Sequence, residues 1–253
     1  MSLELAKEVA DELKEKEGVV GVLLTGSVAA GYADENSDID FILVVDSETY
    51  EDLEEGGDMR REGEYIQYEL KTLEEIENKL KGWRDEISLW VYSQSRVLHD
   101  PTGEVSELLS KYDEYPEDVW KDRLFDYWFH ATGDAPYNSG QAIRRGDLVT
   151  ASLYQIRGME YYTALAFILN KSFVPYRKWR MKAIEDLPDI PDDHVSRVRK
   201  VVASGVTVEE IEDNQEAINK VMGYFEERLL ETGVDKRKVR EPYLFQPNHV
   251  PNI

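Results

Sequence analysis

Residues 23–44, LLTGSVAAGYADENSDIDFILV, contain two apolar segments separated by a small polar turn and a loop with two aspartates at its end. The aliphatic run at residues 19–24 and the apolar run at residues 39–45 are both typical of buried strands. Gly26-Ser27 follows the first run, and Asp38-Ile39-Asp40 opens the second. Side chains two apart on a strand leave the same face, so the two aspartates are expected to point the same way.

These residue types suit a phosphate group and a divalent cation. Gly26 has no Cβ, so a phosphate can approach its backbone closely, and Ser27 adds a hydroxyl donor next to the free N–H groups of a helix start. Two neighbouring carboxylates repel each other, and a hard cation such as Mg²⁺ relieves that repulsion. An ordinary turn and a polar strand start would explain Gly26, Ser27 and Asp38. They would not explain Asp40 within an apolar strand, where an unpaired carboxylate is costly.

The chain contains, in order, an apolar residue, Gly-Ser, a spacer and Asp-apolar-Asp. This arrangement resembles the signature of the DNA polymerase β-like nucleotidyltransferase superfamily. The resemblance is carried by residues 24–40 and implies an α+β domain with a small mixed sheet. It also implies that Gly26 and Ser27 position the β- and γ-phosphates of a nucleoside triphosphate. Asp38 and Asp40 would then bind two Mg²⁺ ions, or Mn²⁺, with a third carboxylate from a neighbouring strand.

Two glutamates in the alternating segment Glu64–Lys71 are candidates for that third carboxylate. Glu64 and Glu69 are five residues apart, so on a strand they face opposite sides and only one can serve. Glu69 is favoured because the sequence after it resembles the passage from the third-acid strand into a helix. The superfamily more often has Asp at this position, and a charged residue on a solvated strand face is the alternative for either glutamate.

The first 115 residues otherwise fit a small α/β unit. Thr72 and Glu75 have the spacing of a capping box, which predicts a helix after the segment that holds Glu69. Apolar residues at positions 3, 5, 9 and 13 predict a helix whose pattern ends at Gly18. The remaining expectations are a helix or an acidic loop over residues 48–55, a breaker at Gly56-Gly57, and a strand in the second half of residues 88–98 that ends at His99.

Long helical patterns rich in aromatic residues begin near Pro116. We therefore divide the chain into a nucleotidyltransferase domain, residues 1–115, and an α-helical bundle domain, residues 116–253, with an extended Pro-rich tail from Glu241. Helical C-terminal halves of antibiotic-modifying members of the superfamily help to bind nucleotide and acceptor. By that resemblance, the second domain is expected to complete the nucleotide and acceptor pocket.

A basic cluster in the helical half, formed by Arg177, Lys178 and Arg180, is the candidate for a triphosphate contact. Lys178 is the first choice and Arg177 the second, and ion pairs of this cluster with Glu185 and Asp186 are the alternative. Two other polar features are expected to be structural. His130 follows an aromatic helix and is expected to be packed. The Arg144-Arg145 pair is expected to lie on the surface, and an approach to phosphates is the alternative.

Composition limits the classes of binding partner and the cellular compartment that can be expected. The chain has 253 residues, no cysteine and a net charge of −22. The lack of cysteine excludes disulfides and thiolate metal sites. The acidic surface repels phosphates, so no nucleic acid polymer is expected as a substrate. Apolar runs fall short of the roughly 20 residues that cross a bilayer, and the N-terminus lacks a signal-peptide layout. A cytoplasmic protein that does not bind membranes is therefore expected.

The expected activity is transfer of a nucleoside monophosphate, AMP from ATP, to a hydroxyl group of a small-molecule acceptor, with release of pyrophosphate. Antibiotic adenylylation is the best-known activity of stand-alone members with helical C-terminal halves. Two alternatives stay open: a protein-AMPylating enzyme of the toxin–antitoxin type, and a catalytically inactive nucleotide-binding homologue. The sequence leaves the acceptor, the preferred base and the choice between monomer and homodimer open.

Overall fold

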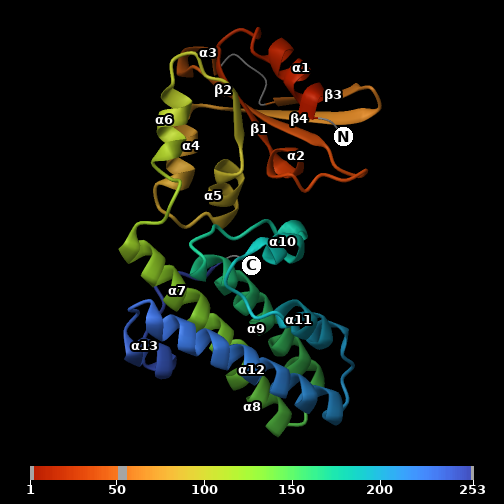
Figure 1. Ribbon diagram of the computed structural model, residues 1–253, viewed down its shortest axis with the longest axis vertical. Helices are drawn as coiled ribbons and strands as arrows, with labels where there is room; N and C mark the ends of the chain where they lie inside the picture. The colour runs from red at the N-terminus through yellow and green to blue at the C-terminus, as the bar shows by residue number, and fades with distance from the viewer. Residues whose placement is uncertain (1–2, 51–55, 252–253) are drawn as a thin grey trace. The chain divides into compact units, whose positions relative to one another are not determined.

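The computed structural model describes residues 3–50 and 56–251, and its chain divides into two compact units, Met1–Glu114 and Tyr115–Ile253 (Figure 1). Each unit has its own packed interior and is described by itself below. Across the described residues, none of the helices combines the length and the apolar character needed to cross a lipid bilayer.

The first unit is built on a five-stranded sheet with the strand order β3-β4-β2-β1-β5 (Figure 1). β1 pairs antiparallel with β2 and β5, β2 pairs parallel with β4, and β3 pairs antiparallel with β4, so the predicted mixed sheet is confirmed. The strands are β1 (Val19–Thr25), β2 (Ile39–Val45), β3 (Gly56–Arg61), β4 (Glu64–Lys71) and β5 (Arg96–His99). Four of them were predicted from hydrophobic patterning, and β3 was not.

One face of this sheet is covered by α1, whose apolar stripe was predicted from its helical spacing. Leu5, Val9 and Leu13 of α1 are buried in one cluster with Leu24 of β1 and Phe41 of β2. The helices of the unit are α1 (Leu3–Leu13), α2 (Gly26–Ala30), α3 (Ser47–Tyr50), α4 (Leu73–Leu80), α5 (Glu86–Ser93) and α6 (Glu104–Ser110). Of the segment 48–55, residues 48–50 belong to α3, and residues 51–55 lie outside the described residues.

The capping box before α4 forms as predicted. The Thr72 hydroxyl accepts a hydrogen bond from the Glu75 backbone N–H at 3.1 Å, and the Glu75 carboxylate accepts one from the Thr72 N–H at 2.8 Å. These bonds satisfy two of the backbone donors that a helix start leaves unpaired. They fix the end of β4, and with it the strand that holds the candidate third carboxylate.

The interpretation of Gly56-Gly57 as a breaker is wrong, because both glycines belong to the edge strand β3. They are needed for close packing rather than for a turn. A Cβ on Gly56 would overlap the backbone oxygen of Tyr68, and a Cβ on Gly57 would overlap the Tyr68 ring. The glycines therefore let β3 lie tightly over β4, and the chain reverses at Glu62-Gly63, where both residues have positive φ.

The second unit is helical, which confirms the predicted bundle. α7 and α9 pack against each other, and α12 packs against α9 (Figure 1). The α-helices are α7 (Glu117–Thr132), α8 (Ser139–Arg144), α9 (Leu148–Leu169), α10 (Arg177–Ala183), α11 (His194–Ala203), α12 (Val208–Glu231) and α13 (Lys236–Arg240). The π-helical segment η1 (Gly133–Asn138) joins α7 to α8, and two short 3₁₀ segments are η2 (Ile184–Asp186) and η3 (Pro242–Leu244).

A buried ion pair ties the C-terminal tail to the bundle. Arg123 and Asp126 of α7 are both buried, with 3.1 Å between the Arg123 Nη1 and the Asp126 Oδ2. The other oxygen of Asp126 accepts a hydrogen bond from the Asn248 backbone N–H at 2.8 Å. Burial raises the pKa of Asp126 to about 6, although the Arg123 charge opposes that rise. The tail was predicted to be extended from Glu241, but its first residues form η3. Beyond η3, the described part of the tail has no regular secondary structure.

Stability of the helical unit is expected to depend on pH through His194. This side chain is fully buried, its Nε2 lies 3.4 Å from the Thr163 hydroxyl, and its ring meets Phe225 edge to face. Burial lowers the pKa of His194 from 6.5 to about 4. Between these values the unfolded chain binds the proton and the folded chain does not. Stability from the neutral ring is therefore complete above pH 6.5 and is lost as the pH falls to about 4.

The loss is expected to reach about 3 kcal/mol of unfolding free energy, since each pKa unit corresponds to about 1.4 kcal/mol. Urea unfolding at several pH values, followed by tryptophan fluorescence, measures it. His194→Gln should flatten the dependence over this range, whereas His99→Gln in the first unit should not. An unchanged slope in His194→Gln would show that another group causes the acid destabilisation.

Candidate functional site

The turn after β1 brings the two halves of the glycine–aspartate motif together. β1 and β2 are antiparallel, and their register places Thr25 beside Asp40. The Thr25 hydroxyl donates to the Asp40 backbone oxygen at 3.3 Å, so the pairing continues to the end of β1. Gly26 and Ser27, which follow directly, therefore lie next to the start of β2.

Gly26 is required in this turn for two reasons. Its φ is +67°, a left-handed conformation that side chains with a Cβ rarely adopt. A Cβ at this position would also overlap Oδ2 of Asp40, so the carboxylate lies directly against the glycine backbone. Ser27 is buried with only 5% of its surface exposed, whereas Asp40 is half-buried. The Asp40 carboxylate thus occupies the space that a side chain at Gly26 would fill.

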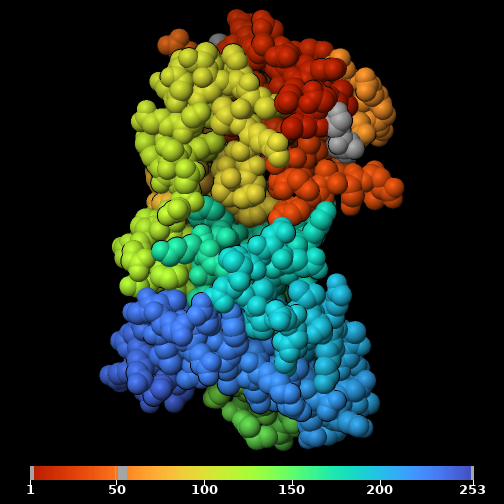
Figure 2. Space-filling view, in the orientation of Figure 1, coloured from red at the N-terminus to blue at the C-terminus, as the bar shows by residue number. Residues whose placement is uncertain are grey.

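The loop between α2 and β2 sets the position of Asp38. Asp38 is half-buried and directly precedes β2, which begins at Ile39. Within the loop, Asp34 accepts hydrogen bonds from the Asn36 N–H at 2.9 Å and from the Ser37 hydroxyl at 3.1 Å. This loop projects from the body of the first unit in the space-filling view (Figure 2). Its internal hydrogen bonds hold the chain as it returns towards Asp40.

Arg96 is a residue of this region that sequence reasoning missed. It lies on β5 beside Leu24, and its Nε donates to the backbone oxygen of Ala29 at 3.0 Å. That oxygen belongs to the last turn of α2, where helix carbonyls lack partners and positive charge is favourable. Arg96 therefore holds the end of the short helix that begins at Gly26. No motif marks it, because its role depends on the pairing of β5 with β1.

The strand register decides which glutamate shares a face with Asp40. β2 and β4 are parallel, and Asp40 lies beside Gln67 while Ile42 lies beside Glu69. Since neighbours in register point the same way and alternate along the strand, Glu69 is on the face of Asp40. Glu64 alternates with Ile66 and falls on the opposite face, which α1 covers. The register thus favours Glu69 as the predicted third carboxylate.

Glu69 is nevertheless not the residue of β4 that lies directly beside Asp40. It is two residues beyond Gln67, which is about 6.6 Å along a strand. Its side chain is 70% exposed, and its Oε2 lies 3.7 Å from the Lys71 Nζ. The residue directly beside Asp40 is Gln67, a neutral amide. The structure thus brings Gly26 and Asp40 together, and it places Glu69 on the same face without direct contact.

The donor atoms of this site fit a cation that arrives with a nucleotide better than one held by protein alone. Across residues 3–50 and 56–251, no three Asp, Glu, His or Cys side chains are close enough together to hold a metal ion. Mg²⁺ usually takes one or two carboxylates and fills its remaining positions with water and substrate phosphates. Asp38 and Asp40 supply two carboxylates, and the Asp40 carboxylate lies against Gly26, so the pair fits that requirement.

The two candidate cations of the basic cluster, Arg177 and Lys178, differ in their contacts. Arg177 pairs with Glu160 of α9 rather than with Glu185 or Asp186. Lys178 is exposed, its Nζ lies 5.8 Å from the ring centres of both Tyr176 and Trp179, and it forms no ion pair within the part of the chain that the structure describes. Lys178 is thus the freer of the two cations proposed to contact a triphosphate.

His130 is packed, as the sequence indicated. Its ring stacks on Tyr161 with 5.2 Å between the ring centres, and burial lowers its pKa. Asp134, one turn further, is also buried and lies 3.2 Å from the Arg157 Nε. Burial raises the pKa of Asp134, although the Arg157 charge opposes that rise. These residues form a polar layer beside η1.

Comparison with known proteins finds two family models that each match part of the chain. A family model described as a nucleotidyltransferase domain matches residues 6–112, and one described as a domain of unknown function (DUF4037) matches residues 63–180. No curated protein matches the sequence. A solved structure of a nucleotidyltransferase-like protein from Exiguobacterium sibiricum 255-15 is similar at 10% identity and a TM-score of 0.49, covering 94% of this chain and 78% of that chain. The first match spans Gly26, Ser27, Asp38, Asp40 and Glu69.

Proposed function

Because residues 6–112 form a nucleotidyltransferase domain, we propose that the protein transfers AMP from ATP to a hydroxyl group of a small molecule and releases pyrophosphate. The observation that carries this proposal is the contact of the Asp40 carboxylate with the backbone of Gly26. That contact joins the turn proposed to bind phosphate to a carboxylate of β2 within one unit. A net charge of −22 argues for a small acceptor rather than a nucleic acid polymer.

Each residue of the motif has its own role in this reaction. The backbone at Gly26 and the Ser27 hydroxyl bind the β- and γ-phosphates. Asp38 and Asp40 would hold Mg²⁺, or Mn²⁺, which when bound neutralises charge on the phosphates. The acceptor oxygen attacks the α-phosphorus in line, the bond from that phosphorus to pyrophosphate breaks, and the hydroxyl proton passes to the Glu69 carboxylate.

The helical unit is proposed to assist nucleotide binding through its basic cluster. Lys178 would contact the triphosphate as a point charge, because it has no ion pair among the described residues. Arg177 would contribute less, since a contact with phosphate must compete with its ion pair to Glu160. Both roles depend on the resemblance to antibiotic-modifying nucleotidyltransferases.

Replacing Glu69 with glutamine is expected to slow transfer by about 100-fold, because a general base contributes about that much to such a step. Glu64→Gln is a matched control, since it removes the same charge from the opposite face of β4. It should change the rate by less than about twofold, because its carboxylate faces away from Asp40. Pyrophosphate release measures both variants, and equal rates would remove Glu69 from the reaction.

A nucleotide-binding protein that does not transfer is the second candidate, and Gln67 favours it. This amide lies directly beside Asp40, where a third carboxylate would most easily share a cation with Asp38 and Asp40. An amide carries no charge and attracts a cation less strongly than a carboxylate. The two candidates differ only in the chemical step, because both bind a nucleotide at the same residues.

Two measurements separate these candidates. Calorimetric titration with ATP and Mg²⁺ tests binding, and pyrophosphate release with aminoglycosides, lincosamides and sugars tests transfer. The proposed function requires metal-dependent binding and release that depends on an acceptor. Binding without release from any acceptor would favour a protein acceptor or the second candidate. The absence of binding would overturn both.

A further inference from the structure

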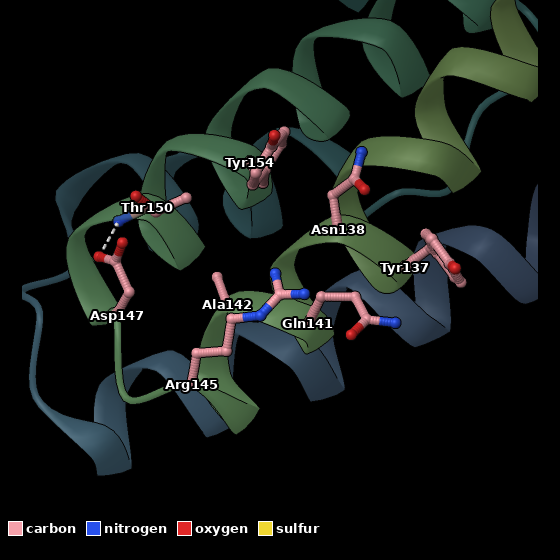
Figure 3. Close-up of a pocket in the computed structure, with 8 residues that line it drawn as sticks. All are labelled: Tyr137, Asn138, Gln141, Ala142, Arg145, Asp147, Thr150 and Tyr154. Carbon is pink, nitrogen blue, oxygen red and sulfur yellow. Dashed lines mark hydrogen bonds between the residues drawn. The ribbon is translucent and has the colours of Figure 1, made fainter.

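The helical unit contains a pocket that the proposed function does not use. It is formed by η1, α8 and the start of α9, and its volume is about 370 Å³ (Figure 3). Tyr137 and Asn138 come from η1, Gln141 from α8, Arg145 from the turn after α8, and Tyr154 from α9. A pocket of this size is within the range that holds a small organic molecule.

The local chain geometry explains why the pocket exists. η1 is a π-helical turn that contains Pro136, and such turns interrupt the regular helix and often mark functional sites. Gly158 of α9 lies against Ala135 of η1 so closely that a Cβ at Gly158 would overlap it. This close contact fixes the two helices on one side of the pocket, and α8 then turns away towards Arg145.

Buried hydrogen bonds hold the frame of the pocket in place. Gln155 of α9 donates to the Ile211 backbone oxygen at 3.0 Å and accepts from the Asn214 amide at 3.3 Å. Ser139 at the start of α8 donates to the Gln215 side-chain oxygen at 3.0 Å. Both helices that line the pocket are thereby bonded to α12. These bonds restrain both helices relative to α12.

Arg145 supplies the charge in this pocket. Its guanidinium group points into the cavity (Figure 3), and this group forms no ion pair or hydrogen bond with any residue in the described ranges. The acidic lining residue, Asp147, instead caps α9 by accepting from the Thr150 N–H at 3.0 Å. A free guanidinium presents five donors in a planar fork that matches a phosphate or a carboxylate.

Two tyrosines and two amides complete the lining. Tyr137 is 62% exposed, so its ring is accessible from solvent, and Tyr154 lies on the opposite helix. The Gln141 amide forms no hydrogen bond with the described residues, and the Asn138 amide donates to Asp134 at 3.3 Å. Aromatic rings favour contact with a planar ring, and amides bind its polar edge.

We propose that this pocket binds a small molecule that joins a planar ring to an oxyanion, either a phosphate or a carboxylate. Arg145 binds the oxyanion, and Tyr137 and Tyr154 contact the ring. The site is formed wholly within residues 137–154, so it stands whether or not the first unit transfers nucleotides.

Phenyl phosphate and benzoate are suitable probes, and ligand-observed NMR of the full chain without divalent metal measures their affinity. Each should bind at least about tenfold more tightly than inorganic phosphate or phenol, because ring and anion are recognised together. Arg145→Gln should weaken both probes by about tenfold, the scale of one charge-assisted pair. Tyr137→Ala should weaken them by about threefold, as a lost ring contact does.

Arg144→Gln is the matched control, because Arg144 is the adjacent exposed arginine and does not line the pocket. It should change the affinity by less than about twofold. Equal effects of Arg144→Gln and Arg145→Gln would overturn the proposal, as would equal binding of inorganic phosphate and phenyl phosphate. Binding that is lost in an Asp38→Asn, Asp40→Asn variant would also overturn it by assigning the probe to the first unit.

Discussion

Replacing both Asp38 and Asp40 with asparagine is expected to abolish metal-dependent ATP binding and to slow pyrophosphate release by about 1,000-fold or more. Asparagine keeps the shape of each side chain but removes two negative charges from the site. A divalent cation contributes several kcal/mol to stabilising phosphoryl charge, and each 1.4 kcal/mol corresponds to about tenfold in rate. Calorimetric titration with ATP and Mg²⁺ measures the first effect, and pyrophosphate release measures the second.

A Glu17→Gln, Glu35→Gln variant is the matched control for this prediction. It removes the same total charge from the same unit, and Glu35 lies in the loop that leads to Asp38. Both control side chains are exposed, so the fold should be unaffected and ATP binding should stay within about twofold of the unchanged protein. Tight metal-dependent binding in the aspartate variant would place the cation elsewhere in the chain.

Replacing Gly26 with alanine is expected to have the second-largest effect. The change strains a backbone with φ of +67° and forces the Asp40 carboxylate away from the turn, because the new Cβ overlaps Oδ2. The left-handed backbone alone costs about 1–2 kcal/mol of stability. Displacement of a catalytic group by about 1 Å can lower a rate by about 100-fold. Urea unfolding and pyrophosphate release measure the two effects separately.

Gly31→Ala separates strain from displacement. Gly31 ends α2 with φ of +79°, but no atom lies within 4 Å of the Cβ that alanine would add. Gly31→Ala should lose about as much stability as the left-handed backbone alone costs in Gly26→Ala. Its ATP binding and transfer should stay within about threefold of the unchanged protein. If both variants lost transfer equally, strain in α2 rather than the contact with Asp40 would control the site.

The glycine–aspartate motif could be predicted from sequence because its physical demands are local. A short aliphatic strand, a glycine without a Cβ and an acid two residues into the next strand each leave a pattern within about twenty residues. The same holds for the capping box at Thr72, which marks the end of β4 and the start of α4. Such features can be recognised in a sequence because few other residues satisfy the same backbone requirement.

The third carboxylate was harder to assign because strand pairing is not local. Only the parallel register of β2 with β4 shows that Gln67 lies beside Asp40 and that Glu69 is two residues further along β4. The edge strand β3 was missed because two consecutive glycines are typical of a turn. In the structure, both glycines are needed because β3 packs closely over Tyr68. Arg96 was missed for the same kind of reason, since its contact depends on the pairing of β5 with β1.

The helical unit was predicted as a bundle, but its details were not. Aromatic residues at helical spacing indicated a core, and Tyr161 and Tyr162 are indeed buried. The π-helical turn at η1 leaves no periodic signal, so the pocket beside it was not expected. Arg145 was expected to be a surface residue, and it is exposed. Its position in a concave site follows only from the turn between α8 and α9.

A crystal structure with a non-hydrolysable ATP analogue and Mn²⁺ tests the central claim most directly. Anomalous scattering is expected to place Mn²⁺ about 2 Å from carboxylate oxygens of Asp38 and Asp40. The β- and γ-phosphates are expected to lie against the backbone of Gly26 and the hydroxyl of Ser27. The same structure would show whether Glu69 reaches the cation. A nucleotide bound away from this turn, or a cation held without either aspartate, would contradict the claim.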